Sequence, residues 1–508
     1  MKFTYIIISL ITLVAVSTPA TGQYGFNKKV SFLGSAGLDF DDIILDENSI
    51  VVRGNIYIDS LDLWGLFVCQ LDTLGQIIWK KTVLDSSRTN DIISNTPTRF
   101  IKSTDRGYLL PVNNFGKGTM GLYKLTSNGD FLFSVEFENE EKSIIPNYLI
   151  ETTDNYYISG YQQRANLGID VFLLKTDLNG NQIWLKYFGS DTLNEYSAGL
   201  ILNNNNTITL GCQIRPPNYE DLPFEYQWRR PWLLTLDTSG AVVKEWKGEQ
   251  NDSRTKGGFG LINTPEGDWG MIYTEVKKVQ IGINEYILGR PSISVLDSNF
   301  NLIWKAEIGE FNSYYNSFFD VEFDPIRNEW VAVGQQGVGE SLMGCIAKFS
   351  NKGNIRWIVY DTAIYDPNNS RHFLGGVSIS STGSIYSAGY IENSNPPYFE
   401  FGWILKVTPD GCVDTLCTTT SILNQVTPKR NISLFPNPAF DFVTLEWSNQ
   451  DFKHSIIEFF NITGSLILRQ EMLAEKEVID IGKLDPGPIF YKIVTKGSIV
   501  QAGTFIKN

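Results

Sequence analysis

The stretch TDLNGNQIW (Thr176–Trp184) decides the fold, because the chain repeats its pattern of a polar turn followed by a large aromatic residue. Similar stretches are LDTLGQIIW, LDSNFNLIW and FSNKGNIRW, which end at Trp79, Trp304 and Trp357. Aligned on the turn glycine, the repeats lie 54, 51, 60, 60, 53 and 58 residues apart, at Gly75, Gly129, Gly180, Gly240, Phe300 (in place of glycine), Gly353 and Gly411. Regular spacing of this length, with strand-like sequence throughout, indicates a solenoid or a propeller.

Each repeat has the sequence pattern of four short strands. Residues 171–177 (VFLLKTD) are an apolar strand, Asn179 and Gly180 suit the positive φ of a hairpin turn, and a strand carrying Trp184 follows. A second pattern of a turn followed by a strand precedes this repeated stretch, as in TTDNYYISG from residue 152. One further strand completes the unit. Seven such units predict an all-β protein whose main part is a seven-bladed β-propeller.

The residue four positions after the turn glycine is predicted to fill the space between neighbouring blades, where a large flat side chain buries much apolar area. This position holds Trp79, Trp184, Trp304, Trp357 and, in the second repeat, Phe133. The fourth repeat has Lys244 there, with Trp246 two residues later, and the seventh has Thr415. No outer strand follows Gly411, so we expect residues 28–34, which resemble residues 185–191, to supply it and close the ring.

Composition and charge exclude some classes of function. Aromatic residues make up 13% of the chain and charged residues only 19%, which is typical of an ordered β-rich protein. The formal charge of -14 repels phosphate backbones, so no nucleic-acid partner is expected. Residues 1–22 have a basic start, a short apolar core and small residues at Ala20 and Gly22, and are predicted to be a signal peptide. No later segment is apolar enough to be a transmembrane helix.

Cysteines, histidines and acidic residues give no convincing catalytic or metal site, and no cofactor is expected. Cys412 and Cys417 are predicted to form a small disulfide loop, with two free thiols as the alternative, whereas Cys69, Cys212 and Cys345 are interpreted as buried apolar residues. His372, expected on a connection between blades, and His454 are interpreted as structural. Asp39, Asp41 and Asp42 are interpreted as a solvated turn, with a calcium site as the alternative.

Binding is predicted on the face that carries the longer connections, because variable loops on a rigid scaffold usually hold the ligand. The connection at 214–232 and a second one near residue 398 are rich in the residue types that anchor interfaces and stack on sugars. The candidate binding residues are Tyr219, Phe224, Tyr226, Trp228, Arg229, Arg230, Trp232, Tyr398 and Phe399. In the alternative interpretation these aromatic residues only cover the propeller and pack on one another.

Composition changes again after residue 417. Residues 418–431 are polar and lack periodicity, which indicates a linker between residues 23–417 and a second module at 432–508. That module has alternating strand patterns at 442–447, 455–461, 466–470, 477–481 and 489–494, which predict a small antiparallel β-sandwich.

The module resembles the type A C-terminal sorting domain of the type IX secretion system of Bacteroidetes. The resemblance covers FPNPA from Phe435, FFNITGSLI, VIDIGKLDPGPIFYKI and the ending GTFIKN. The matching residues are Phe435, Pro436, Asn437, Pro438, Gly464, Asp480, Leu484, Gly487, Tyr491 and Lys507. The resemblance implies export through that secretion machinery at the outer membrane, by way of the periplasm, followed by release or attachment to the cell surface.

The sequence therefore favours a secreted or surface-attached propeller that is not an enzyme and binds a glycan or a protein through its long-loop face. A polysaccharide hydrolase or lyase with acidic residues on the same face is the alternative, and a structural surface-layer component is a third. Carboxylates that converge in a pocket with a basic residue would favour the enzyme, and an aromatic shelf without them would favour binding.

Overall fold

The computed structural model describes residues 25–32, 35–47, 49–85, 91–93, 98–138, 143–164, 168–218, 221–222, 229–248, 255–281, 284–338, 341–361, 370–393, 399–413, 432–435, 439–447, 454–461, 465–474, 476–495 and 498–507. Within these ranges the regular elements are β-strands, and no α-helix occurs. The chain divides into two compact units, Met1–Leu423 and Asn424–Asn508.

The first unit consists of small antiparallel sheets, most of them built from four consecutive strands. The separate four-stranded sheets are β2 (Ser35–Asp46), β3 (Ser49–Ile58), β4 (Leu63–Asp72) and β5 (Ile77–Val83); β11 (Ile144–Glu151), β12 (Asn155–Arg164), β13 (Gly168–Asp177) and β14 (Gln182–Phe188); β15 (Asn194–Leu202), β16 (Ile208–Arg215), β17 (Arg230–Leu236) and β18 (Val242–Lys247); and β19 (Thr255–Asn263), β20 (Trp269–Ile281), β21 (Asn284–Leu296) and β22 (Leu302–Glu307).

The remaining strands of this unit form a five-stranded and an eight-stranded sheet. The first holds β6 (Ile92–Ile93), β7 (Ile101–Lys102), β8 (Tyr108–Asn114), β9 (Thr119–Leu125) and β10 (Phe131–Phe137). The second combines β23 (Ser317–Asp324), β24 (Glu329–Val338), β25 (Ser341–Ser350) and β26 (Ile355–Asp361) with β27 (Ser370–Ile379), β28 (Ile385–Asn393), β29 (Phe399–Val407) and β1 (Phe26–Val30). Within the described ranges, the parallel pair Leu342 and Arg371 is the single backbone pairing that joins its two groups of four.

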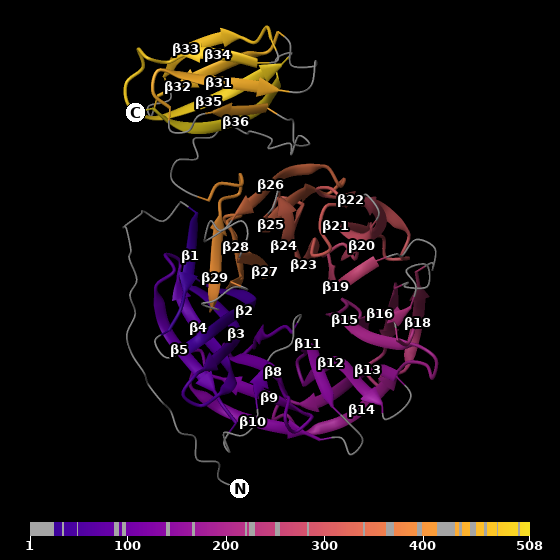
Figure 1. The fold of residues 1–508 in the computed structure, drawn as a ribbon. Coiled ribbons are helices and arrows are strands. Elements are labelled where there is room, and N and C mark those ends of the chain that lie inside the picture. Colours follow the sequence, from indigo (N-terminus) through magenta and orange to yellow (C-terminus); the bar gives the residue numbers. More distant parts are fainter. Residues whose placement is uncertain are drawn as a thin grey trace. The chain divides into compact units, whose positions relative to one another are not determined.

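The sheets follow one another around a common centre, with the first strand of each sheet innermost (Figure 1). Successive inner strands contact each other from β11 through β15, β19 and β23 to β27, and β2 contacts β27, β28 and β29. We call this last contact, of β2 with β27–β29, the closing seam. The arrangement is consistent with a β-propeller.

The N-terminal strand completes the last group of strands, as predicted. β1 runs antiparallel to β29, with Phe26 opposite Lys406 and Val30 opposite Gly402. The strand covers residues 26–30 rather than the expected 28–34, and residues 33–34 lie outside the described ranges. Asn27 also accepts a hydrogen bond of 2.8 Å from the buried indole of Trp403, which fixes β1 on β29.

The hairpin turns of the repeat have the predicted geometry. The turn glycines have positive φ, from 76° at Gly129 to 87° at Gly411, and Phe300 adopts 69° at the equivalent position. In four repeats an aspartate three residues before the turn residue accepts hydrogen bonds from backbone amides two and four residues further on. These residues are Asp72, Asp177, Asp237 and Asp297. Their carboxylates therefore stabilise the turn itself.

Each large side chain of the repeat lies against the turn of the following sheet. A Cβ added at Gly129 would lie 2.5 Å from Trp79, and one at Gly353 would lie 2.7 Å from Trp304. The same relation holds for Gly180 with Phe133, Gly240 with Trp184, Gly411 with Trp357 and, across the closing seam, Gly75 with Phe26 and Lys28. Where Phe300 replaces glycine, its ring packs on Trp246, with centroids 5.7 Å apart. The predicted inter-sheet role of the aromatic position is confirmed, and the shifted Trp246 fulfils it in the fourth repeat.

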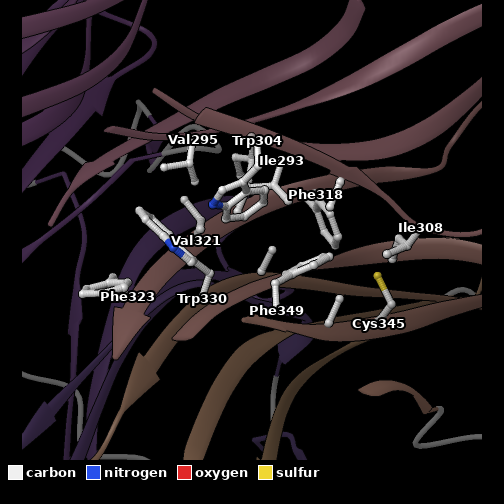
Figure 2. Close-up of a cluster of buried hydrophobic side chains, with 14 residues drawn as sticks. Ile293, Val295, Trp304, Ile308, Phe318, Val321, Phe323, Trp330, Cys345 and Phe349 are labelled. Carbon is white, nitrogen blue, oxygen red and sulfur yellow. The ribbon is translucent and has the colours of Figure 1, made fainter. Parts of the chain in front are cut away.

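The apolar core lies between consecutive sheets. Between β19–β22 and β23–β26, Trp304 meets the buried Trp330 edge-on, with ring centroids 6.2 Å apart, and also contacts Phe349 (Figure 2). Cys345 belongs to the same cluster and is fully buried. Burial of these apolar side chains between neighbouring sheets holds the sheets together.

The innermost strands share one irregularity near the centre. Their pairing with the second strand shifts register at Phe40/Asp42, Pro146/Tyr148, Ser197/Gly199, Phe318/Asp320 and Leu374/Gly376. A β-bulge bends and twists a strand locally. At the closing seam, Cβ atoms added to Gly375 and Gly376 would lie 3.0 and 2.9 Å from the backbone of Asp41 and Asp42, so the two bulges are in close contact.

The second unit contains a three-stranded and a four-stranded antiparallel sheet. They consist of β30 (Ile432–Phe435), β31 (Phe442–Trp447) and β34 (Lys476–Asp480), and of β32 (Ile456–Phe460), β33 (Leu466–Glu471), β35 (Gly487–Thr495) and β36 (Ser498–Lys507). Both sheets contribute to one core, in which Val443 and Ile479 lie with Ile457, Phe459 and Ile493. The predicted strands correspond to β31–β35 within two residues at each end.

Candidate functional site

The strand connections emerge at two opposite edges of the first unit, because the strands within each sheet alternate in direction. Connections after the first and third strands are short turns, such as 103–107 and 178–181. The other connections include the longest ones, such as 216–229. We call the edge that carries them the long-loop edge.

The structure describes only part of the predicted binding set. Tyr219, Phe224, Tyr226, Trp228 and Tyr398 lie outside the described residues, as does the side chain of Phe399. Arg229 and Trp232 are only 8% and 7% exposed. The Trp232 indole donates a 2.8 Å hydrogen bond to Glu245 and packs in a core cluster, so its side chain serves packing. Arg230, at the start of β17, is half-buried opposite Ile214.

Beside the 214–232 connection, the long-loop edge carries a cluster of two tyrosines and an arginine. Tyr161 of β12 and Tyr196 of β15 have ring centroids 5.1 Å apart. Arg215 ends β16; its guanidinium lies 4.4 Å from the Tyr196 ring centre and donates a hydrogen bond to the Tyr196 hydroxyl. All three side chains are half-buried. Partly exposed rings and a planar guanidinium are suited to stacking on a sugar ring or to contact with a protein.

Sequence analysis missed Tyr161 and Tyr196, because each one occupies an ordinary strand position. Their common feature is that both lie at the long-loop end of a strand, Tyr161 late in β12 and Tyr196 early in β15. A strand-by-strand alignment of the repeats could have shown that these ends meet in consecutive sheets.

Next to this cluster, two carboxylates converge on Gly189. A Cβ added there would lie 2.2 Å from Asp170 Oδ1 and 3.1 Å from Glu195 Oε2. Asp170 pairs with Arg164 at 2.8 Å, and Glu195 accepts a 2.9 Å hydrogen bond from Ser190. Burial raises the pKa of Glu195 to about 7, and the nearby Asp170 adds to the shift. Burial also raises the pKa of Asp170, so both acids are desolvated, and Asp170 is in addition paired with Arg164.

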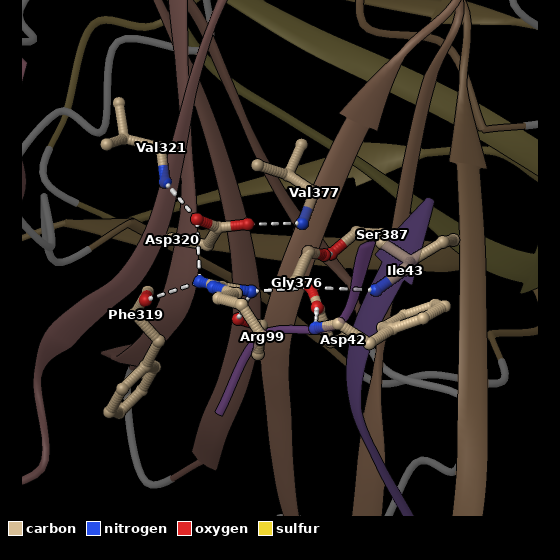
Figure 3. A network of polar contacts seen from close by, with 11 residues as sticks. Asp42, Ile43, Arg99, Phe319, Asp320, Val321, Gly376, Val377 and Ser387 are labelled. Carbon is tan, nitrogen blue, oxygen red and sulfur yellow. Dashed lines mark hydrogen bonds and ion pairs between the residues drawn. The ribbon is translucent and has the colours of Figure 1, made fainter. Parts of the chain in front are cut away.

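A second charged cluster lies at the centre of the first unit and consists of Asp42, Arg99 and Asp320 (Figure 3). Arg99 is 2.7 Å from Asp42 Oδ1 and 2.6 Å from Asp320 Oδ1. Burial alone would lower the pKa of Arg99, but the two ion pairs raise it above its ordinary value.

Backbone amides complete this central cluster. Asp42 accepts from Ile43 and Phe100, and Asp320 accepts from Val321 and Val377, at 2.8 to 3.0 Å. Every carboxylate oxygen therefore has a protein donor, and the contacts connect β2, the segment before β7, β23 and β27. This network is a structural clamp across the centre, because both carboxylates and the guanidinium join strands of different sheets.

The interpretation of Asp39, Asp41 and Asp42 as a solvated turn is wrong. These residues lie within β2, and Asp41 and Asp42 are 3% and 4% exposed. The three aspartates flank Phe40 on an innermost strand, which has a bulge at Phe40/Asp42. They therefore lie near the centre of the first unit. A calcium site is not supported either, since no group of three potential metal ligands occurs among the described residues.

Asp39 instead faces a glutamate across the closing seam. A Cβ added at Gly37 would lie 3.3 Å from Glu400 Oε2 and 3.1 Å from Trp64, so Glu400 of β29 reaches over to β2. Burial raises the pKa of Asp39 well above its usual range, and Glu400 and Asp41 add to the shift. Burial, with repulsion from Glu392, raises the pKa of Glu400 to about 7. Coupled and desolvated carboxylates of this kind are frequent at functional sites.

His372 and the described free cysteines have packing roles, whereas His454 is exposed and lies 2.9 Å from Glu471. His372 lies inside β27 and not on a connection between sheets, which corrects its predicted position; it is buried edge-on against Trp403, with centroids 5.6 Å apart. Cys69, Cys212 and Cys345 are buried free thiols, as expected. Cys417 lies outside the described ranges, so its pairing with Cys412 stays a prediction. Among the described residues, no helix has the length and apolarity needed to cross a membrane.

The predicted sorting residues of the second unit that the structure describes have packing or turn roles. Leu484 and Tyr491 pack against the core, and Asp480 accepts a 2.8 Å hydrogen bond from the Gly482 amide. Gly487 begins β35 opposite Lys507 of β36, which is 7% exposed. Pro436, Asn437, Pro438 and Gly464 lie outside the described residues.

Comparison with known proteins defines the second unit first by class and then by family. Its two antiparallel sheets form a small all-β module at the C-terminus. Residues 433–508 match the family described as the secretion system C-terminal sorting domain, which is the tail of type IX secretion cargo. This domain interacts with the secretion machinery and indicates a protein that is secreted or attached to the outer-membrane surface. The comparison with curated proteins gives no match.

Solved structures resemble the first unit only distantly. The β-propeller domain of the Trilobed protease from Pyrococcus furiosus is 9% identical, with a TM-score of 0.40 over 76% of this chain and 94% of that one. The GH93 α-L-arabinofuranosidase of Fusarium graminearum is 10% identical, with a TM-score of 0.36 over 61% and 95%. The endo-arabinase from Bacteroides thetaiotaomicron is 10% identical, with a TM-score of 0.31 over 54% and 95%. Likeness at this level carries no information on ligand or chemistry.

Proposed function

We propose that the protein is an exported seven-bladed β-propeller that binds a glycan or a protein at its long-loop edge and does not catalyse a reaction. The seven blades are β2–β5, β6–β10, β11–β14, β15–β18, β19–β22, β23–β26 and β27–β29 with β1. Residues 1–22 act as the signal peptide, 23–417 form the propeller, 418–431 the linker and 432–508 a β-sandwich that directs export. A disulfide between Cys412 and Cys417 closes the last turn.

One observation carries the binding proposal: Tyr161, Tyr196 and Arg215 form a partly exposed cluster beside the aromatic connection at 214–232. Aromatic residues and arginine contribute most of the affinity in many interfaces. The tyrosine and arginine side chains already contact each other, so little conformational entropy is lost when a ligand stacks on them.

A glycan array probed with the mature chain tests this proposal, together with variants at the site. Tyr196→Ala and Arg215→Ala are expected to reduce binding at least tenfold, and Trp228→Ala and Arg229→Ala report on the predicted connection. Tyr187→Ala is the matched control, because Tyr187 is exposed on the outer strand β14. Binding that survives both Tyr196→Ala and Arg215→Ala would exclude the cluster. Absence of any glycan or protein ligand would favour a structural surface-layer role.

A polysaccharide hydrolase or lyase is the second candidate, and the Asp39–Glu400 pair favours it. Acid–base catalysis uses carboxyl groups whose pKa lies near the working pH, and Glu400 meets that condition. Release of sugars from a polysaccharide by the native chain, and loss of that release in both Asp39→Asn and Glu400→Gln, would support it. If no polysaccharide is cleaved, the pair has no catalytic role.

A further inference from the structure

A second group of aromatic and charged side chains lies on the long-loop edge, on other strands than the Tyr161–Tyr196 cluster. The connection at 308–316 joins β22 to β23, so it emerges at this edge. It carries Tyr314 and Tyr315, whose rings are nearly perpendicular, at 88°, with centroids 5.6 Å apart. The two tyrosines are 39% and 45% exposed. Core packing alone does not account for two large rings exposed at consecutive positions.

Hydrogen bonds from both neighbouring sheets fix the backbone that carries the two rings. The side chain of Gln335 on β24 donates to the Tyr315 carbonyl oxygen at 2.8 Å. The fully buried Asn316 donates to the Gly289 carbonyl oxygen of β21 at 2.9 Å and accepts from the Gly337 amide of β24 at 2.7 Å. Because the backbone is already held in place, little conformational entropy is lost when a ligand contacts the tyrosine rings.

An arginine and a glutamate from the last group of strands border these rings. Arg371, near the start of β27, places its guanidinium 4.6 Å from the centre of the Tyr315 ring and donates to the Tyr315 hydroxyl at 3.4 Å. Glu392 stands opposite Arg371 on β28, and its carboxylate lies 4.0 Å from Arg371 Nη1. The side chains of Arg371 and Glu392 are 42% and 38% exposed, so both are accessible to a ligand. We call Tyr314, Tyr315, Arg371 and Glu392 the tyrosine shelf.

The chemistry of the tyrosine shelf fits a neutral sugar. The C–H face of a sugar ring packs on a partly exposed aromatic ring, and adjacent sugar hydroxyl groups can accept from a guanidinium and donate to a carboxylate. The opposite charges of Arg371 and Glu392 stand side by side, so the shelf has no excess positive charge, and the formal charge of -14 of the chain repels polyanions. A stable protein interface usually has a larger apolar centre than two tyrosine rings.

We propose that the tyrosine shelf is a second binding site, separate from the cluster of Tyr161, Tyr196 and Arg215, and that it binds a sugar ring of a neutral polysaccharide. The sugar ring stacks on the exposed tyrosines, while the guanidinium of the shelf donates to one hydroxyl group and the carboxylate accepts from the next. The shelf and the cluster share no residue and come from different strands, so each site can bind without the other.

Affinity electrophoresis of the full mature chain tests the shelf, with galactomannan, xyloglucan, mixed-linkage β-glucan or arabinan as neutral probes and polygalacturonate as the charged one. At least one neutral polysaccharide is expected to retard the chain, and polygalacturonate is not. Tyr315→Ala and Arg371→Ala, made in the native chain and in Tyr196→Ala, should weaken this binding about tenfold, whereas Tyr315→Phe keeps the ring and most of the binding. Tyr187→Ala is the matched control, because Tyr187 is 40% exposed on β14.

Nitration of exposed tyrosines by tetranitromethane, followed by mass spectrometry of peptides, gives a second measurement that needs no substitution. The polysaccharide that retards the chain should slow nitration of Tyr314 and Tyr315, whereas Tyr187, which has a similar exposure, should react equally fast with and without it. The proposal is overturned if no neutral polysaccharide retards the chain, if polygalacturonate binds more tightly than the neutral probes, or if the two shelf tyrosines are not protected. Retention that is lost in Tyr196→Ala but complete in Tyr315→Ala would exclude the shelf and support the first cluster, and the reverse result would exclude the cluster and support the shelf.

Discussion

Asp42 and Asp39 lie three residues apart on β2, yet their carboxylates are in opposite situations. Asp42 accepts from Arg99 and from two backbone amides, so its charge is balanced at the centre. Among the described residues, Asp39 accepts its hydrogen bonds from Asn55, and the negative charge of Glu400 adds to the rise of its pKa. The difference shows that burial alone does not decide the role of an acidic residue. Neighbouring segments supply hydrogen-bond donors to Asp42, which therefore stabilises the centre, whereas Asp39 is subject to repulsion from another carboxylate.

The largest effect expected from this comparison is that of Arg99→Ala. Two nearly buried carboxylates would lose their shared partner, which costs about 3–5 kcal/mol of the free energy of unfolding. Denaturant unfolding of the first unit measures it. Arg356→Ala is the control, because Arg356 pairs with Glu329 at the surface and should cost less than about 1 kcal/mol. Equal losses in the two variants would mean that the central ion pairs are no stronger than a surface pair.

A smaller loss is expected from Asp42→Asn. The amide keeps the shape of the side chain, but its NH2 group would face the Phe100 amide or Arg99, leaving donors opposite donors. We expect a loss of about 2 kcal/mol in the free energy of unfolding, measured by denaturant unfolding. A stability equal to that of the native chain would contradict the interpretation of Asp42 as part of the clamp.

Asp39→Asn should have the smallest effect, and the opposite sign. At pH 8 the substitution removes repulsion against Glu400 and keeps an acceptor for the Asn55 amide, so we expect stabilisation by about 1 kcal/mol. Because the folded-state pKa of Asp39 is raised, the gain shrinks as the pH is lowered and should disappear below about pH 4, where the unfolded chain also holds this proton. Thermal unfolding at both pH values measures the difference. Destabilisation at pH 8 would remove the contrast with Asp42.

Local patterns made much of the fold predictable from sequence. The turn glycines, the aromatic position and the strands of the second unit depend on contacts within a hairpin or on a repeated neighbour, and these leave a period in the sequence. The closing strand was also predictable, because residues 28–34 resemble the equivalent outer strand of another repeat.

The charged centre was not predictable, since its partners are far apart in the chain. The cluster brings together three separate segments, which contribute Asp42, Arg99 and Asp320. Nothing in the sequence shows that the Arg99 side chain extends to the centre of the first unit. The bulge in β2 also hid Asp41 and Asp42, because an irregular strand with three aspartates has the composition of a loop. The ligand-binding prediction met the same limit: Tyr161 and Tyr196 become neighbours only when β12 and β15 are placed side by side.

The aromatic residue of each repeat contacts the turn glycine of the following repeat, so these contacts all run in the same direction around the first unit. Every repeat supplies the aromatic residue of one such contact and the turn glycine of another. A repeat therefore needs a neighbouring repeat on each side to complete both contacts. Duplication of one whole repeat adds one aromatic residue and one turn glycine together, so every such contact keeps both of its partners. Duplication of a partial period would leave one bulky side chain or one turn glycine without its counterpart.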